Sequence, residues 1–403
     1  MQKRTFATIG YYAAFIVLGA VGAALGPTLP DLARQTGVTL KAIGVVFTAR
    51  SLGYLLGSSQ GGRLYDHLPG HPLVAMALFV LAAMVTLVPL SGALWLLIGA
   101  WFVLGLGEGT VDVGCNTLLL WTYKDRAGPF LSGLHFFFGL GSLLSPILIA
   151  QVILLTGGIR WGYWTLALVA LPVAGWLLSA KAPEQRGDPR AESSDRRIRY
   201  VPVILISFFL FLYVGAEIGF SGWVFTYAVQ MNLADEVSAS YLVSVFWGAL
   251  TAGRLLAVPI SGLVKPRYLL FGALAGCLIS LGIPLLWPTQ PLSIWVASVG
   301  LGGSMAAIFP TTLALAERRL GATGKVMGWF FGGSGLGGML LPGTLGQVIE
   351  SFRPQAMIVA IGLDLLVAVG VLVTFLLIPV DRPRISETEE GEGQRSVRIG
   401  ENL

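Results

Sequence analysis

Long apolar runs follow one another along this chain, and short polar connections separate them. A transmembrane α-helix needs about 20 predominantly apolar residues. The runs are continuous, unlike the alternating segments of about 10 residues that build membrane β-barrels. The pattern predicts an all-α integral membrane protein with twelve transmembrane helices. They cover residues 6–32, 39–61, 73–90, 94–121, 129–155, 161–180, 201–230, 238–262, 268–287, 292–316, 326–349 and 356–378.

The composition agrees with a membrane protein and excludes other classes. Of the 403 residues, 55% are hydrophobic and 12% are charged, about half the charge of a soluble domain. Two cysteines, Cys115 and Cys277, rule out a disulfide scaffold. With three histidines in all, we expect no His-built zinc site.

The distribution of Lys and Arg predicts the orientation of the chain. Twenty of the 26 basic residues fall on the side that carries both termini and the even-numbered connections, and four fall on the other side. Cytoplasmic loops carry such an excess. We therefore expect both termini in the cytoplasm and the protein in the plasma or inner membrane. The basic residues are scattered among short loops, so no nucleic-acid partner is expected.

The chain contains an internal repeat that divides it into two halves. Glycines of three span pairs recur at offsets of 195, 196 and 200 residues: Gly105 with Gly300, Gly139 with Gly335, and Gly53 with Gly253. Parallel repeats of this kind are found in transporters that hold their substrate at the repeat interface. The predicted organisation is a six-helix bundle (1–180), a cytoplasmic linker (181–199), a second six-helix bundle (200–380) and a disordered cytoplasmic tail (381–403).

The loop GRLYDHLPGH (62–71), together with the twelve spans and the 6+6 repeat, resembles the major facilitator superfamily. The family pattern Gly-x-Leu-x-Asp-x-x-Gly-Arg is present with one extra residue before its second Gly and with His71 at the basic position. The strings GLGEGTVDVGCN (105–116), LHFFFG (134–139) and YVGAE (213–217) are most similar to the branch of fucose permeases and sodium-dependent glucose transporters.

This resemblance implies a secondary active transporter that moves a sugar or a similar small polar solute by alternating access. The coupling ion would be H⁺ or Na⁺, and no other cofactor is expected. A proton-coupled exporter of drugs or lipids on the same fold is the alternative. An enzyme is disfavoured because no catalytic constellation is present and no loop is long enough to house one. The expected partners are a small-molecule substrate and the bilayer, with the chain acting as a monomer.

Six charged residues fall well inside predicted spans, where a charge costs on the order of 3 kcal/mol on insertion scales. Their formal sum is −2, because four are acidic and two are basic. The excess negative charge favours cation coupling over passive carriage. These residues are Arg50, Glu108, Asp112, Glu217, Arg254 and Asp364.

Glu108, Asp112 and Asn116 recur every fourth residue and so share one stripe of the fourth span. The functional interpretation is that Glu108 and Asp112 bind the coupling ion, a proton or Na⁺, while the side-chain amide of Asn116 binds a substrate or ion. The alternative is a structural ion pair between Arg50 and Glu108. Arg50 itself either clamps an anionic substrate or neutralises Glu108.

Further candidates lie in the fifth and seventh spans. His135 has a side chain that relays protons near neutral pH or binds a hydroxyl. Glu217, Trp223 and Tyr227 combine a carboxylate with aromatic rings, a composition that suits a sugar. Trp and Tyr are also common at membrane interfaces.

A third group of residues is predicted to control conformation rather than to bind substrate. By resemblance, the loop that carries Gly62 and Asp66 stabilises the outward-open state. Arg254 is expected to serve the mirrored role in the second half.

Overall fold

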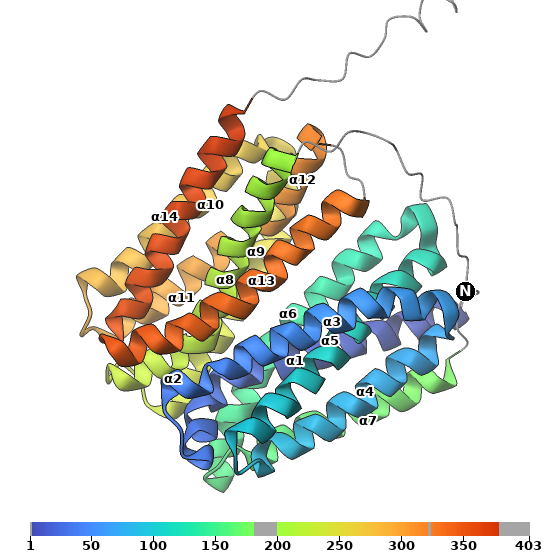
Figure 1. Cartoon of the computed structure of the whole chain (residues 1–403), viewed down its shortest axis with the longest axis horizontal. Helices are drawn as coiled ribbons and strands as arrows, with labels where there is room; N and C mark the ends of the chain where they lie inside the picture. Colours follow the sequence, from blue (N-terminus) through green and yellow to red (C-terminus); the bar gives the residue numbers. More distant parts are fainter. Residues whose placement is uncertain (1, 181–199, 321–323, 379–403) are drawn as a thin grey trace, which may run out of the picture.

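The computed structural model describes residues 2–180, 200–320 and 324–378, and all the regular structure in these ranges is helical (Figure 1). The predicted linker and tail lie outside this part. The first half contains α1 Gln2–Thr36, α2 Leu40–Ile43, α3 Val45–His67, α4 Gly70–Leu87, η1 Val88–Leu90, α5 Leu94–Tyr123, η2 Lys124–Arg126, α6 Gly128–Thr156 and α7 Arg160–Ser179.

The second half repeats this series of long helices. It contains α8 Tyr200–Gln230, α9 Glu236–Leu263, α10 Pro266–Leu286, α11 Pro291–Met305, α12 Ile308–Leu320, α13 Gly324–Ser351 and α14 Gln355–Leu377.

Eleven helical segments in the described ranges are long and apolar enough to cross a membrane. The one predicted span outside these eleven, 326–349, forms α13, a helix of 28 residues. Nine of those residues are glycine, which lowers its hydropathy. The predicted all-α membrane fold is confirmed.

The tenth span is interrupted between α11 and α12. Pro310 follows the break and has no N–H to donate to the carbonyl of Ala306, four residues earlier. At the same break, the Met305 carbonyl accepts a hydrogen bond from the Tyr213 hydroxyl of α8 at 3.1 Å. A backbone carbonyl that a broken helix frees inside a membrane protein is thus satisfied by a neighbouring helix.

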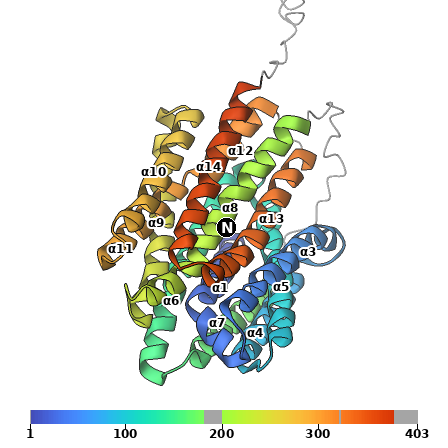
Figure 2. The ribbon, with the colours of Figure 1, turned by 60° about the vertical axis from the view of Figure 1, so that its left-hand side comes forward.

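The same helix pairings occur in both halves. In the first half α1 packs on α6, α3 on α5, and α4 on α7. In the second half the corresponding pairs are α8 with α13, α9 with α11, and α10 with α14. The internal repeat of the sequence therefore appears as a repeated packing scheme, and Figure 2 shows the two groups of helices side by side.

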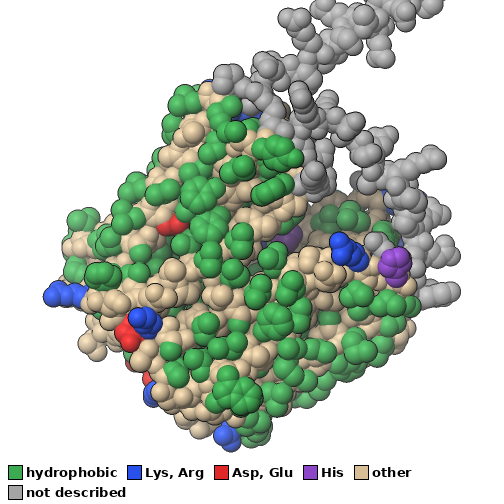
Figure 3. Space-filling view, in the orientation of Figure 1, with side chains coloured by type: hydrophobic (Ala, Val, Ile, Leu, Met, Phe, Trp, Pro, Cys, Tyr) green, Lys and Arg blue, Asp and Glu red, His purple; other side chains and the backbone are tan. Residues whose placement is uncertain are grey.

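The two halves touch through α3 with α13, α6 with α9, and α1 with α8. At one end, Lys41 N donates to Glu350 Oε2 at 2.6 Å, and Gln151 Nε2 donates to the Tyr241 hydroxyl at 2.5 Å. Toward the opposite end the halves diverge (Figure 1), and the molecule is hollowed between them (Figure 3). The structure is thus closed at one end and open at the other.

Helices α3 and α5 approach each other unusually closely at glycines. A Cβ atom on Gly105 would lie 1.9 Å from the Arg50 carbonyl oxygen, and one on Gly53 would lie 2.0 Å from the Phe102 carbonyl oxygen. Small residues permit this backbone proximity between transmembrane helices.

We predict that Gly105→Ala destabilises the protein by about 1–3 kcal/mol or more, because the added methyl group forces the two backbones apart. The measurement is thermal unfolding in detergent. Gly99→Ala on the same helix is the matched control, since a Cβ there meets no atom within 4 Å. Equal midpoints for the two variants would contradict the prediction.

Candidate functional site

The first element of the site is a buried ion pair between α3 and α5. Arg50 Nε donates to Glu108 Oε2 at 2.8 Å, and Arg50 Nη2 donates to Glu108 Oε1 at 3.1 Å. The side chains are 19% and 4% exposed. This bidentate geometry is the arrangement that Arg makes with carboxylates, and it corresponds to the structural pair that the sequence left as an alternative.

One turn further along both helices lies a second contact. The Tyr54 hydroxyl donates to Asp112 Oδ2, and Asn116 Nδ2 donates to Asp112 Oδ1 at 2.8 Å. Both Arg50–Glu108 and Tyr54–Asp112 are separated by 58 residues, so they form successive rungs between parallel helices. The predicted stripe on α5 therefore faces α3 rather than lipid.

His135 of α6 lies beside these rungs. It is exposed, packs edge-on against Phe15 with ring centroids 6.2 Å apart, and interacts electrostatically with both Asp112 and Arg254. Asp112 is partly exposed as well. The two side chains thus lie where water can reach them, although they are deep within their helices.

A second ion pair lies in the other half. Arg254 Nη2 of α9 is 3.9 Å from Glu217 Oε1 of α8, with side-chain exposures of 29% and 9%. This places Arg254 beside a carboxylate and near His135. Its predicted gating role stays a prediction.

The two ion pairs neutralise two of the four acidic residues that lie inside the spans. Glu108 and Glu217 each have an arginine partner. Among the described spans, Asp112 and Asp364 are acids with no Lys or Arg ion pair. Asp364 Oδ2 of α14 is buried and has no hydrogen-bond partner in the part of the chain that the structure describes. Asp112 is therefore the unneutralised acid of the central site.

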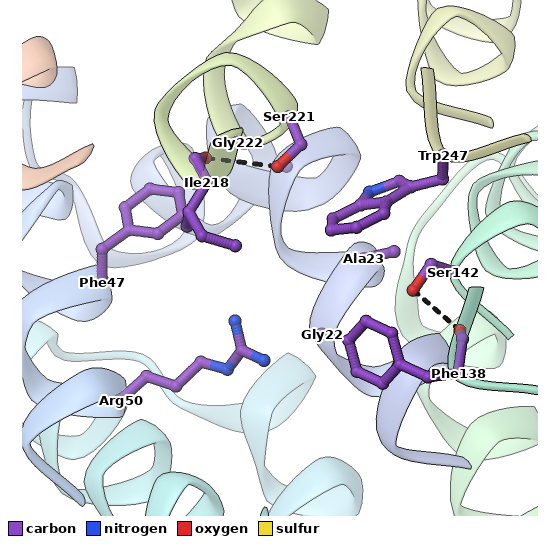
Figure 4. A pocket seen from close by; sticks show the side chains of 11 residues that line it. Gly22, Ala23, Phe47, Arg50, Phe138, Ser142, Ile218, Ser221, Gly222 and Trp247 are labelled. Atoms are coloured by element: carbon purple, nitrogen blue, oxygen red, sulfur yellow. Dashed lines mark hydrogen bonds between the residues drawn. The ribbon is translucent and has the colours of Figure 1, made fainter. Parts of the chain in front are cut away.

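A cavity of about 30 Å³ lies between the halves and next to Arg50. Figure 4 shows Arg50 and Phe47 reaching in from α3, with Phe138 and Trp247 on the opposite side. Its volume leaves room for about two water molecules. The cavity is lined by Gly22, Ala23, Gly26, Phe47, Arg50, Phe138, Ser142, Ile218, Ser221, Gly222 and Trp247.

The sequence did not predict most of these lining residues. In the sequence, nothing distinguishes three of them from ordinary small or core residues of apolar helices: Ser142, Ser221 and Trp247. Only the packing of one half on the other brings these side chains together. Their place next to glycines in α6, α8 and α9 was the available signal, but glycines are frequent throughout this chain.

Two predicted aromatic residues lie away from the cavity lining. Trp223 and Tyr227 are both 0% exposed. Trp223 Nε1 donates to the Pro342 carbonyl at 2.8 Å, and its ring lies 6.0 Å from that of Phe47. In this conformation Trp223 therefore packs the closed end, where α8 meets α13.

Gly62 and Asp66 fall within α3, but their surroundings lie outside what the structure describes. Their predicted gating role is not tested. The described residues also contain no cluster of three or more His, Cys, Asp or Glu side chains that could hold a metal ion. A Na⁺ site at Glu108 and Asp112 would therefore draw on hydroxyl, amide or backbone oxygens too.

Comparison with known proteins decides the family. The family model described as Major Facilitator Superfamily matches residues 11–342. The chain belongs to the major facilitator superfamily.

Two relatives of this superfamily member are named as glucose transporters. It is 31% identical to sodium-dependent glucose transporter 1A of Mus musculus over 385 residues, which cover 86% of the chain and 90% of the relative. It is 28% identical to sodium-dependent glucose transporter 1 of Homo sapiens, over 97% of this chain and 83% of the relative. The predictions of a multi-pass transporter and of a non-enzyme are confirmed.

Solved structures share the fold at low sequence identity. A D-xylose–proton symporter superposes with a TM-score of 0.79 at 14% identity, over 93% of this chain and 98% of the symporter. A nucleoside transporter superposes with a TM-score of 0.75 at 12% identity, over 94% and 100%.

We predict that Arg50→Ala and Glu108→Ala each destabilise this superfamily member more than the double variant does. Removing one partner leaves an unpaired buried charge, at a cost of about 3–5 kcal/mol. Thermal unfolding of the three variants gives the coupling. Arg34→Ala, whose side chain is 66% exposed beside Asp31, is the control and should change stability little. Additive effects at Arg50 and Glu108 would contradict the ion pair.

Proposed function

We propose that this protein is a secondary active transporter that moves a sugar or a similar small neutral polar solute by alternating access, coupled to H⁺ or Na⁺. The observation that carries the proposal is the cavity between the halves, which combines balanced charge, hydrogen-bonding groups and aromatic rings.

The hydrogen-bonding groups of the cavity include both donors and acceptors. Ser142 Oγ donates to the Phe138 carbonyl at 3.0 Å, and Ser221 Oγ donates to the Ile218 carbonyl at 3.2 Å. With their protons engaged, both oxygens can still accept hydrogen bonds. The Arg50 guanidinium retains N–H groups beyond the two that contact Glu108. A solute rich in hydroxyl groups matches such a set, because each hydroxyl donates and accepts.

Charge and shape support the same class of solute. Glu108 offsets the charge of Arg50 at close range, so the cavity gives no strong preference for an ion. Phe47, Phe138 and Trp247 offer ring faces for the C–H surface of a sugar. The relatives named as glucose transporters and the D-xylose–proton symporter support the proposal.

The exporter alternative has one observation in its favour, the aromatic rings around the cavity. The hydrogen-bonding side chains of the same cavity, Arg50, Ser142 and Ser221, however, would find no partners on a lipophilic cation. We therefore favour the sugar transporter, and transport assays with hexoses and with lipophilic cations separate the two.

We further propose that Asp112 carries the coupling cation. It is the acid of the central site without an arginine partner, and it lies with His135 in the part of the molecule that water can reach. Binding H⁺ or Na⁺ would neutralise it and so remove the cost of its charge when the site closes.

The orientation is also a proposal, based on the charge bias of the connections. With both termini in the cytoplasm of a cell whose plasma membrane holds the protein, the closed end faces outward. The cleft then opens to the cytoplasm, and the structure represents an inward-open state.

We predict that Asp112→Asn abolishes gradient-driven accumulation of hexose in proteoliposomes while exchange of labelled for unlabelled substrate continues. Separate Na⁺ and pH gradients identify the ion. Asp364→Asn, which removes the other unpaired acid, is the matched control and should leave coupling unchanged. Loss of both activities in Asp112→Asn would point to a structural role, and absence of any hexose transport by the unmodified protein would refute the proposed function.

A pair of cysteine variants tests the proposed orientation. Gly92→Cys lies between α4 and α5, and Gly128→Cys lies at the start of α6; both are exposed positions where a Cβ meets no atom within 4 Å. A membrane-impermeant maleimide added to intact cells should label Gly92→Cys only, since Cys115 and Cys277 are buried. The reverse labelling would overturn the assigned orientation.

A further inference from the structure

Trp247 of α9 occupies a position in the cavity that the predicted site did not include. Its ring projects toward the cavity from the side opposite Phe47 and Arg50 (Figure 4). It packs edge-on against Phe138 of the first half, with centroids 6.1 Å apart. The residue is only 4% exposed, so the packing of the two halves fixes the ring in place.

The indole N–H of Trp247 has no hydrogen-bond partner among the described residues, although it is buried. A buried donor left unpaired costs about 1–3 kcal/mol, and such groups in a native protein call for an explanation. Trp101 and Trp176 also have unpaired indole nitrogens. Of the side chains with unpaired buried atoms in the described ranges, only Trp247 lines the cavity.

We propose that Trp247 is a specificity-determining residue whose indole N–H donates to one oxygen of a neutral, polyhydroxylated solute. This inference rests on the proposed function and names a contact within it. Arg50 supplies donors from the first half and Trp247 supplies one from the second, so a solute that accepts from both binds the two halves at once. A solute without the oxygen that faces Trp247 leaves the N–H unpaired and binds less well.

The test uses the full chain in proteoliposomes and a series of glucose analogues, each lacking one hydroxyl group. For the unmodified protein we expect one analogue to stand out, with KM raised roughly tenfold. In Trp247→Phe, which keeps an aromatic ring but lacks the N–H, glucose and that analogue should have the same KM. Trp101→Phe removes another unpaired buried indole N–H, outside the cavity, and should keep the wild-type discrimination.

Several results would overturn the inference. A flat profile across the analogue series in the unmodified protein does so without any variant. Retained discrimination in Trp247→Phe, or the same loss in Trp101→Phe, also does so while leaving sugar transport intact. If the unmodified protein transports no hexose, the proposed function fails first and this contact fails with it.

Discussion

The cost of charge inside a membrane governs the arrangement of this protein. Ionisable side chains within transmembrane helices are tolerated only where they meet a partner or water. Here Arg50 holds Glu108 within the first half, and Arg254 lies beside Glu217 within the second. Each of these two pairs lies within one half, so movement of one half relative to the other does not separate the charges of either pair. Asp112 remains unpaired, beside the water-accessible His135.

The glycines of α3 and α5 allow the polar side chains of these two helices to reach each other. Because the backbones nearly touch at Gly53 and Gly105, the neighbouring side chains meet in two successive pairs, Arg50 with Glu108 and Tyr54 with Asp112. Close packing therefore controls electrostatics as well as stability in this part of the molecule.

The contacts between halves differ in kind from those within them. At the closed end they include the hydrogen bond from Lys41 N to Glu350 and the exposed ion pair between Arg34 and Glu236 at 3.6 Å. A few neutral or singly charged hydrogen bonds of this sort are each worth about 0.5–3 kcal/mol. Such an interface can open at modest cost, which is what alternating access requires, whereas the paired arginines keep each half intact.

The sequence by itself determined the all-α membrane fold, the repeat and the charged positions, since apolar length and the cost of intramembrane charge are properties of single segments. It also predicted the stripe of Glu108, Asp112 and Asn116, because a 3.6-residue period sets which side chains share a helix face. Only the tertiary structure decided how the charges pair, and it moved Trp223 and Tyr227 out of the cavity lining and into buried packing. The cavity residues Phe47, Ser142, Ser221 and Trp247 come from four helices of two halves, and no local pattern encodes which residues of separate helices will meet.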